Sequence, residues 1–96
     1  MTTLTIVAEN GRGLKPLLSS AIDNEMRLLE AGAQRTERRI REFEAKYGFR
    51  TREFLAQYEV GDLHECLDFD EWVGEHRTLV RLREDQAALR GLRIED

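Results

Sequence analysis

A heptad rhythm of apolar and small side chains in the first half of the chain is the feature that most limits its fold. Over more than three heptads the steps alternate between four and three residues, at Ile22, Met26, Leu29, Ala33, Thr36, Ile40, Phe43 and Tyr47. A repeat of 3.5 residues is typical of helices that pack along their whole length, as in coiled coils. Pro16 suits a first helical turn and Gly48 suits a helix end. The pattern therefore predicts one helix over residues 14–47, about 48 Å long from Pro16 onward at 1.5 Å per residue.

Two further helices are predicted after the long one. Residues 51–60 form a short amphipathic segment, for which Thr51 provides an N-cap. Residues 68–90 carry a broad apolar face, and Asp68 followed three residues later by Glu71 has the spacing of a capping box. Glycines close both segments.

The ends of the chain favour short strands. Residues 3–8 alternate between two faces and contain Thr, Ile and Val, whose branched side chains favour strands. The segment 10–13 then predicts a turn, so residues 1–13 are interpreted as a strand followed by a turn. In the tail over residues 91–96, residues 92–94 could form a last strand paired with residues 3–7.

These elements predict a mainly α fold that forms a single domain over residues 1–96. The simplest architecture is an antiparallel helical hairpin, in which the long helix and the last helix are the arms and the short helix is the corner. The apolar stripe of the long helix is longer than the stretch that the later helices are expected to cover. We therefore expect a homo-oligomer, most simply a dimer, with its interface at Ile22, Met26, Leu29, Ile40 and Phe43.

Charge is divided along the chain into three blocks. The net charge is −4 and 35% of the residues are charged. Residues 35–52 hold seven basic and three acidic groups, residues 53–76 hold eight acids without Lys or Arg, and residues 77–93 hold five arginines and two acids. The acidic block falls on the predicted corner. Such blocks either pair within the fold or attract a charged partner.

The sequence predicts a cytoplasmic protein that is not embedded in a membrane. The single Cys66 excludes an intrachain disulfide and fits a reducing compartment. The N-terminal residues lack a basic segment followed by a long apolar run, so no signal peptide is expected. No stretch approaches the roughly 18 apolar residues that a spanning helix needs.

A metal site was considered in the loop before the last helix and is not expected. His64, Glu65, Cys66, Asp68, Asp70 and, one helix further on, His76 offer ligand atoms. Structural zinc sites usually present paired ligands at tight spacing, and this segment has no such pair. The residues are better interpreted as a polar loop and a helix cap, so no metal and no cofactor is predicted.

Catalysis is not expected either. Glu71 and Glu75 are helical neighbours near His76, but solvated helix faces carry such pairs routinely. Ser19 and Ser20 lie in no nucleophile motif, and no phosphate-binding or dinucleotide-binding fingerprint is present. The chain is therefore predicted not to be an enzyme.

Nucleic-acid binding is the alternative function. Residues 35–41 place four arginines on the long helix, and arginines at that density can contact phosphates. Interleaved glutamates, among them Glu42 at four residues from Arg38, favour an exposed salt-bridged helix face instead. The first residues superficially resemble the strand of small dimeric ribbon–helix–helix repressors, whose first helix is much shorter than the one predicted here.

Two later segments carry a recognisable pattern, KYGFRTREFLAQYEVGDL over residues 46–63 and DFDEWVGEHRTLVRLREDQAALRGLRI over residues 68–94. In these segments the chain resembles a group of small prokaryotic proteins found in gene pairs of toxin–antitoxin type. The pattern is mostly structural and carries no catalytic motif. The resemblance implies an antitoxin-like protein that binds and masks a cognate partner. We therefore expect a non-catalytic, self-associating interaction module, with a small dimeric DNA-binding regulator as the alternative.

Overall fold

The computed structural model describes residues 2–7 and 13–95 of the chain. Its elements in chain order are β1 (Thr2–Thr5), α1 (Leu14–Tyr47), α2 (Thr51–Glu59), α3 (Leu67–Arg90) and β2 (Leu92–Glu95). The end of the predicted strand at Ala8, the turn over residues 10–13 except for Gly13, and the last residue of the tail lie outside the described residues.

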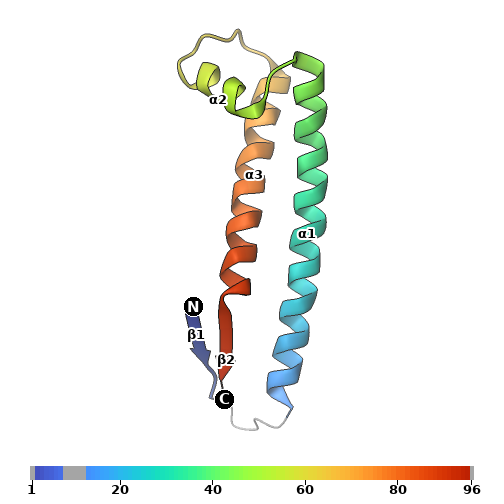
Figure 1. Cartoon of the computed structure of the whole chain (residues 1–96), viewed down its shortest axis with the longest axis vertical. Helices are drawn as coiled ribbons and strands as arrows, with labels where there is room; N and C mark the ends of the chain where they lie inside the picture. The colour runs from blue at the N-terminus through green and yellow to red at the C-terminus, as the bar shows by residue number, and fades with distance from the viewer. Residues whose placement is uncertain (1, 8–12, 96) are drawn as a thin grey trace.

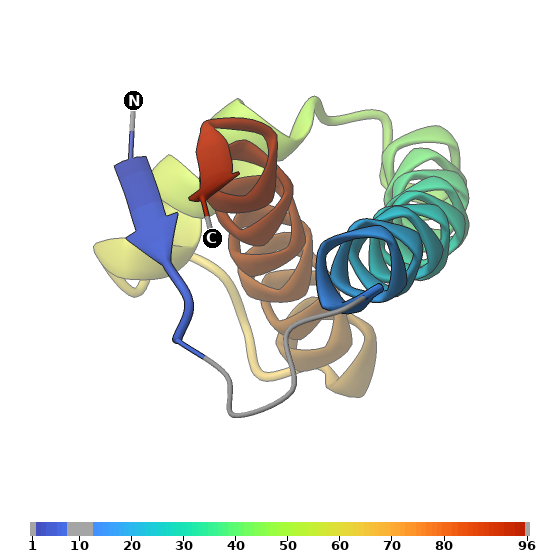
Figure 2. The same cartoon turned by 90° about the horizontal axis from the view of Figure 1, so that it is seen from below.

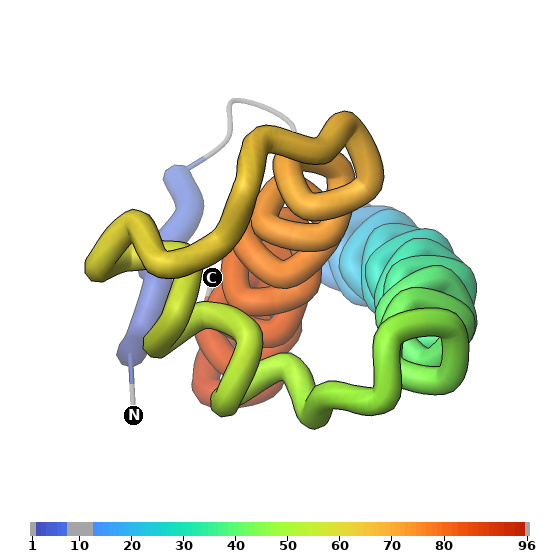
Figure 3. The backbone as a smooth tube through the Cα atoms, turned by 90° about the horizontal axis from the view of Figure 1, so that it is seen from above, coloured from blue at the N-terminus to red at the C-terminus, as the bar shows by residue number. Residues whose placement is uncertain are grey.

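The protein is a helical hairpin with a small sheet at its open end (Figure 1). α1 and α3 run antiparallel, and α2 with the loop after it lies at the closed end, on the side of α3 away from α1 (Figure 3). The molecule is elongated, with extents of 59 × 22 × 18 Å. The predicted mainly α hairpin is confirmed, and α1 continues without interruption through Gly32.

The terminal strands pair, as the alternation of the first residues suggested. β1 and β2 form a two-stranded parallel sheet in which Thr2 lies beside Leu92 and Thr5 beside Glu95. Viewed from below, β1 lies on the far side of β2 and α3 from α1 (Figure 2). The outer side of β1 therefore faces away from the hairpin.

An aromatic core fills the closed end of the hairpin. The indole of Trp72 is fully buried and stacks on Phe54, with ring centroids 3.9 Å apart and planes within 3° of parallel. On α1, Phe43 stacks 5.7 Å from the same indole. The buried cluster that joins all three helices consists of Ile40, Phe43, Phe54, Phe69, Trp72 and Val73. Large rings bury much apolar area per residue, which suits a chain this short.

A hydrogen-bonded chain fixes the corner helix to the core. The indole Nε1 of Trp72 donates to the hydroxyl of Thr51 at 3.0 Å, and that hydroxyl donates to the Glu44 carboxylate at 3.0 Å. The backbone N–H of Thr51 also donates to Glu44, at 2.8 Å. The prediction that Thr51 is an N-cap is wrong: Arg50 occupies the cap position without a side-chain bond, and Glu44 of α1 satisfies the first N–H of α2.

The predicted capping box of the last helix is also wrong. α3 begins at Leu67, and its cap residue Cys66 makes no side-chain cap bond. The side chains of Asp68 and Glu71 instead reach α1, where they meet Lys46 and Arg39. These acids connect two helices because an ion pair between elements outcompetes the local bond to the helix end.

The apolar stripe of α1 is covered mostly by its own chain, which corrects the expected interface. Leu29, Ile40 and Phe43 are buried against the rest of the molecule, whereas Ile22 and Met26 are only partly buried. α3 has 24 residues and can run along most of the 34-residue α1. The heptad rhythm in this chain therefore marks an intramolecular seam along most of its length.

A polar network holds the two arms together near their middle. The guanidinium of Arg83 on α3 donates to Glu30 at 2.9 Å and pairs with Glu37, both on α1. Gln86 is 2% exposed, and its amide donates to Glu30 at 2.6 Å and accepts from Arg83 at 2.8 Å. The buried amide is thus satisfied, as burial of a polar group requires.

Replacing Phe54 by Ala should be the most damaging truncation at the closed end. It removes a fully buried ring from between Trp72 and Phe69, and a Phe→Ala change in a core costs about 3–5 kcal/mol. Urea denaturation followed by Trp72 fluorescence measures the loss. Leu28→Ala is the matched control because Leu28 is 60% exposed, and it should cost under about 1 kcal/mol. Equal losses for both variants would contradict this account of the core.

Candidate functional site

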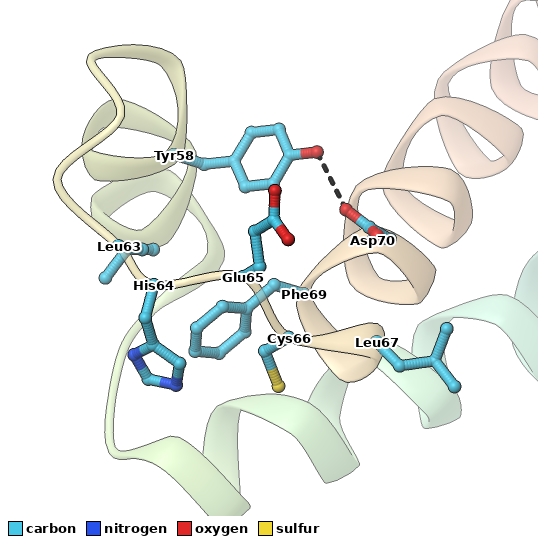
Figure 4. Close-up of a pocket in the computed structure, with 8 residues that line it drawn as sticks. All are labelled: Tyr58, Leu63, His64, Glu65, Cys66, Leu67, Phe69 and Asp70. Atoms are coloured by element: carbon cyan, nitrogen blue, oxygen red, sulfur yellow. Dashed lines mark hydrogen bonds between the residues drawn. The ribbon is translucent and has the colours of Figure 1, made fainter.

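A hollow opens at the closed end of the hairpin, between α2, the loop after it and the first turns of α3 (Figure 4). Its volume is about 550 Å³. Its lining residues are Tyr58, Leu63, His64, Glu65, Cys66, Leu67, Phe69 and Asp70. We call this hollow the head pocket. Apolar and aromatic side chains line it together with two carboxylates, whereas no Lys or Arg does.

The head pocket is held open by contacts between its own walls. Tyr58 on α2 donates its hydroxyl to the Asp70 carboxylate on α3 at 3.0 Å (Figure 4), which raises the pKa of Tyr58. The His64 ring lies 5.4 Å from the Phe69 ring at a tilt of 57°. Phe69 is buried, whereas the side chains of Glu65 and Asp70 are exposed. The pocket therefore combines a rigid aromatic wall with solvent-facing negative charge.

Three side chains beside the pocket form a polar latch between α1 and α3, which we define as Lys46, Tyr47 and Asp68. Asp68 accepts from Lys46 Nζ and from the Tyr47 hydroxyl, both at 2.6 Å. The Lys46 bond, then the Tyr47 bond, lowers the pKa of Asp68, and the bond to Asp68 raises the pKa of Lys46. The Cys66 sulfur lies 3.8 Å from the Tyr47 hydroxyl.

The protonation states of the latch favour a structural role. The hydrogen bond from the Tyr47 hydroxyl to Asp68, followed by burial, raises the pKa of Tyr47 to about 12. At neutral pH Tyr47 is therefore protonated and Asp68 ionised. General acid–base catalysis works best with pKa values near the operating pH, and both groups are displaced away from it. The latch joins the helices electrostatically.

The candidate metal ligands take part in separate interactions at different places. Asp68 belongs to the latch and Asp70 accepts from Tyr58. His76 lines a separate hollow of about 280 Å³ with Leu55, Tyr58, Glu59, Val73 and Arg77. Within residues 2–7 and 13–95, no group of three or more His, Cys, Asp or Glu side chains is placed to hold a metal ion.

The residues considered for catalysis lie in two separate groups. The Glu71 carboxylate pairs with Arg39 on α1 at 3.0 Å, so it binds across the hairpin. Ser19 and Ser20 are exposed near the start of α1, at the opposite end of the molecule from the head pocket. Glu71, Glu75 and His76 stay neighbours on α3, and the structure does not bring the two serines to them.

The arginine-rich stretch of α1 is partly neutralised by acids. Arg39 pairs with both Glu42 and Glu71, and the guanidinium of Arg41 lies 3.9 Å from the Glu37 carboxylate. Glu42 thus pairs with Arg39, three residues away, and the expected pairing with Arg38 is wrong. Two of the four arginines in residues 35–41, Arg39 and Arg41, are thus paired within the chain.

The sheet at the open end has two chemically different faces. In the parallel register Leu4 lies beside Ile94, so Leu4, Ile6, Leu92 and Ile94 share one face. The other face carries Thr3 and Thr5 beside Arg93 and Glu95, which form an ion pair at 3.2 Å. All four residues of β1 are exposed to solvent. The sequence suggested the pairing, but not its parallel direction.

Comparison of the chain with protein-family models, with curated proteins and with solved structures finds no match. None of the helices in the described part of the chain combines the length and the apolar character needed to cross a bilayer.

Breaking the latch should return Tyr47 to ordinary titration. Because the folded pKa of Tyr47, about 12, exceeds its ordinary value of 10.0, its contribution to stability is complete below pH 10 and is lost as the pH rises through about 12. In Asp68→Asn the pKa of Tyr47 should fall toward 10. Tyrosinate absorbance during alkaline titration measures this, and Tyr47→Phe identifies which transition belongs to Tyr47. Asp85→Asn, on the exposed shaft of α3, is the control and should leave the curve unchanged.

Proposed function

We propose that this protein is a non-catalytic, self-associating interaction module that binds a basic segment of a cognate protein at the closed end of its hairpin. The observation that carries the proposal is the head pocket. It joins an aromatic wall to two exposed carboxylates within a 24-residue stretch, 53–76, that holds eight acids and no Lys or Arg. An antitoxin-type role, in which the module masks its partner, is the concrete form that we favour.

The placement of charge supports a positively charged partner. Of the acids in residues 53–76, Asp68 and Glu71 are paired with basic groups of α1, whereas Glu65 and Asp70 face the pocket and solvent. Net charges of opposite sign accelerate encounter and disfavour partners of the wrong sign. The head pocket therefore favours a cationic group.

The composition of the pocket supports a side chain as the group that enters it. An arginine or lysine carries an apolar stem and a charged head. The stem can lie on the partly exposed Tyr58 and Leu63, where cation–π contact with the Tyr58 ring adds to the attraction, while the head meets Glu65 or Asp70. Arginine is the better fit because its planar guanidinium stacks on aromatic rings and pairs with carboxylates.

The intramolecular pairing of the arginine-rich stretch favours this function over a DNA-binding regulator. Arg39 and Arg41 contact acids of their own chain, which weakens the positive stripe that phosphate binding requires. The strand β1 pairs with β2 of the same chain, so it is not presented as an isolated major-groove reader.

Binding of defined peptides tests the proposal. The probe is a fluorescent peptide of alternating arginine and leucine, and its control replaces each arginine with glutamate. The arginine peptide should bind and the glutamate peptide should not. Glu65→Gln should weaken the arginine peptide by about five-fold, since it removes one of the two pocket carboxylates. Glu84→Gln, an exposed acid on the shaft of α3, is the matched control and should bind as the unmodified protein does.

Two results would contradict the proposal. One is an equal loss of affinity for the arginine peptide in Glu65→Gln and Glu84→Gln, which would mean that net charge alone attracts the peptide. The other is binding of duplex DNA that is tighter than peptide binding and falls steeply with salt, which would favour the regulator. Co-expression with the product of the neighbouring gene, using the same two variants, extends the test to a cognate protein.

A further inference from the structure

The two-stranded sheet at the open end is structurally incomplete. Parallel sheets are almost always covered on both faces, and isolated two-stranded sheets are at best marginally stable in water. Here the parallel pair stands at the edge of the molecule, and every residue of β1 is exposed. Leu4 is 47% and Val7 94% exposed, although both are apolar. Additional strands would give the sheet the width that stable sheets have.

The hydrogen bonds to β2 define which backbone groups of β1 are open. Thr2 donates its N–H to Gly91 at 3.0 Å and Ile6 donates to Glu95 at 2.9 Å. Backbone groups alternate in direction along a strand, so Leu4 also faces β2. The N–H and C=O groups of Thr3 and Thr5 therefore point to the outer edge.

Within residues 2–7, that outer edge carries none of the side chains that usually prevent strand pairing. Natural edge strands carry lysines or other charges, proline, or a bulge. Residues 2–7 contain neither a charged side chain nor proline, in a chain of which 35% of the residues are charged. Like charges would oppose the approach of an identical strand, and none is present in this segment.

We propose that β1 pairs antiparallel with β1 of a second copy of this chain, about a twofold axis at Thr5. This pairing rests on the self-association in the proposed function and assigns that self-association to a defined surface. In this register Thr5 lies opposite the partner's Thr5, Thr3 opposite the partner's Val7, and Leu4 opposite the partner's Ile6. The pairing extends the strand from Thr5 to Val7, so that Thr3, Thr5 and Val7 all engage, which gives about six backbone hydrogen bonds between the copies.

The side chains suit this register as well as the backbone does. Leu4 and Ile6 share a face with Leu92 and Ile94, so pairing joins the apolar faces of both copies into one sheet of four strands. The opposite face carries threonines, and cross-strand threonine pairs stabilise sheets. Because the axis is twofold, one contact pairs the outer edges of β1 in both copies, and the assembly closes as a dimer.

A proline at position 5 tests the pairing without disturbing the chain's own sheet. The N–H of Thr5 points outward, and proline is tolerated in edge strands at such a position. Analytical ultracentrifugation over a concentration series should show a dimer for the unmodified protein. Thr5→Pro should raise the dissociation constant at least about ten-fold, with an unchanged circular dichroism spectrum. Thr5→Val keeps the N–H and the strand propensity, so it should dimerise as the unmodified protein does.

A disulfide test reads the register directly and does not depend on proline. In a Cys66→Ser background, Thr5→Cys places two cysteines opposite each other at about 5.5 Å between Cα atoms, within the range that a disulfide spans. Mild oxidation should link the copies. Leu4→Cys is the matched control: in this register Leu4 faces the partner's Ile6 and lies more than about 7 Å from the partner's Leu4, so it should link poorly.

The proposal is overturned if the unmodified protein stays monomeric at high micromolar concentration, if Thr5→Pro dimerises as well as Thr5→Val, or if Leu4→Cys links and Thr5→Cys does not. Peptide binding at the head pocket, measured on Thr5→Pro, separates this result from the proposed function. A monomeric Thr5→Pro that still binds the arginine peptide supports both. A dimer that binds no such peptide supports the strand pairing and counts against the head pocket.

Discussion

The stacking of Phe54 on Trp72 closes the hairpin, and the rest of the structure depends on it. The two rings lie 3.9 Å apart and both are fully buried, so they fix the corner helix against α3. The indole N–H then needs a partner, because a buried donor without one is costly. The Thr51 hydroxyl accepts this hydrogen bond and donates its own to Glu44 on α1. One aromatic contact thereby sets the position of all three helices.

The same closed end concentrates the charge that gives the molecule its proposed function. Once α2 is fixed, the loop after it and the first turn of α3 form the head pocket, with Glu65 and Asp70 in its lining. The latch of Lys46, Tyr47 and Asp68 neutralises one acid within the fold. Glu71 is paired with Arg39, whereas Glu65 and Asp70 face solvent beside aromatic rings. The far end of this 59 Å molecule is different in kind, since β1 there carries no charged side chain.

The hairpin and the bounds of its longest helix were predictable, whereas the partners of most polar side chains were not. The heptad rhythm, Pro16 and Gly48 are local signals, and they located α1 at residues 14–47. The same rhythm suggested an interface through Ile40 and Phe43 that the structure places in the core, because periodicity shows which face is covered but not by what. Capping patterns failed at both later helices, where Glu44, Asp68 and Glu71 bind across elements that sequence spacing cannot relate.

Sequence alone determined the helical content, the three charge blocks and the tendency of both ends of the chain to form strands, because propensity, periodicity and composition are local properties. Tertiary structure decided which acid meets which base, that the terminal strands are parallel, and that aromatic and acidic side chains converge on one pocket. Tyr58 and Asp70 are 12 residues apart, and their hydroxyl–carboxylate bond exists only because α2 folds beside α3. Contacts of that kind depend on the path of the whole chain, and no local pattern encodes them.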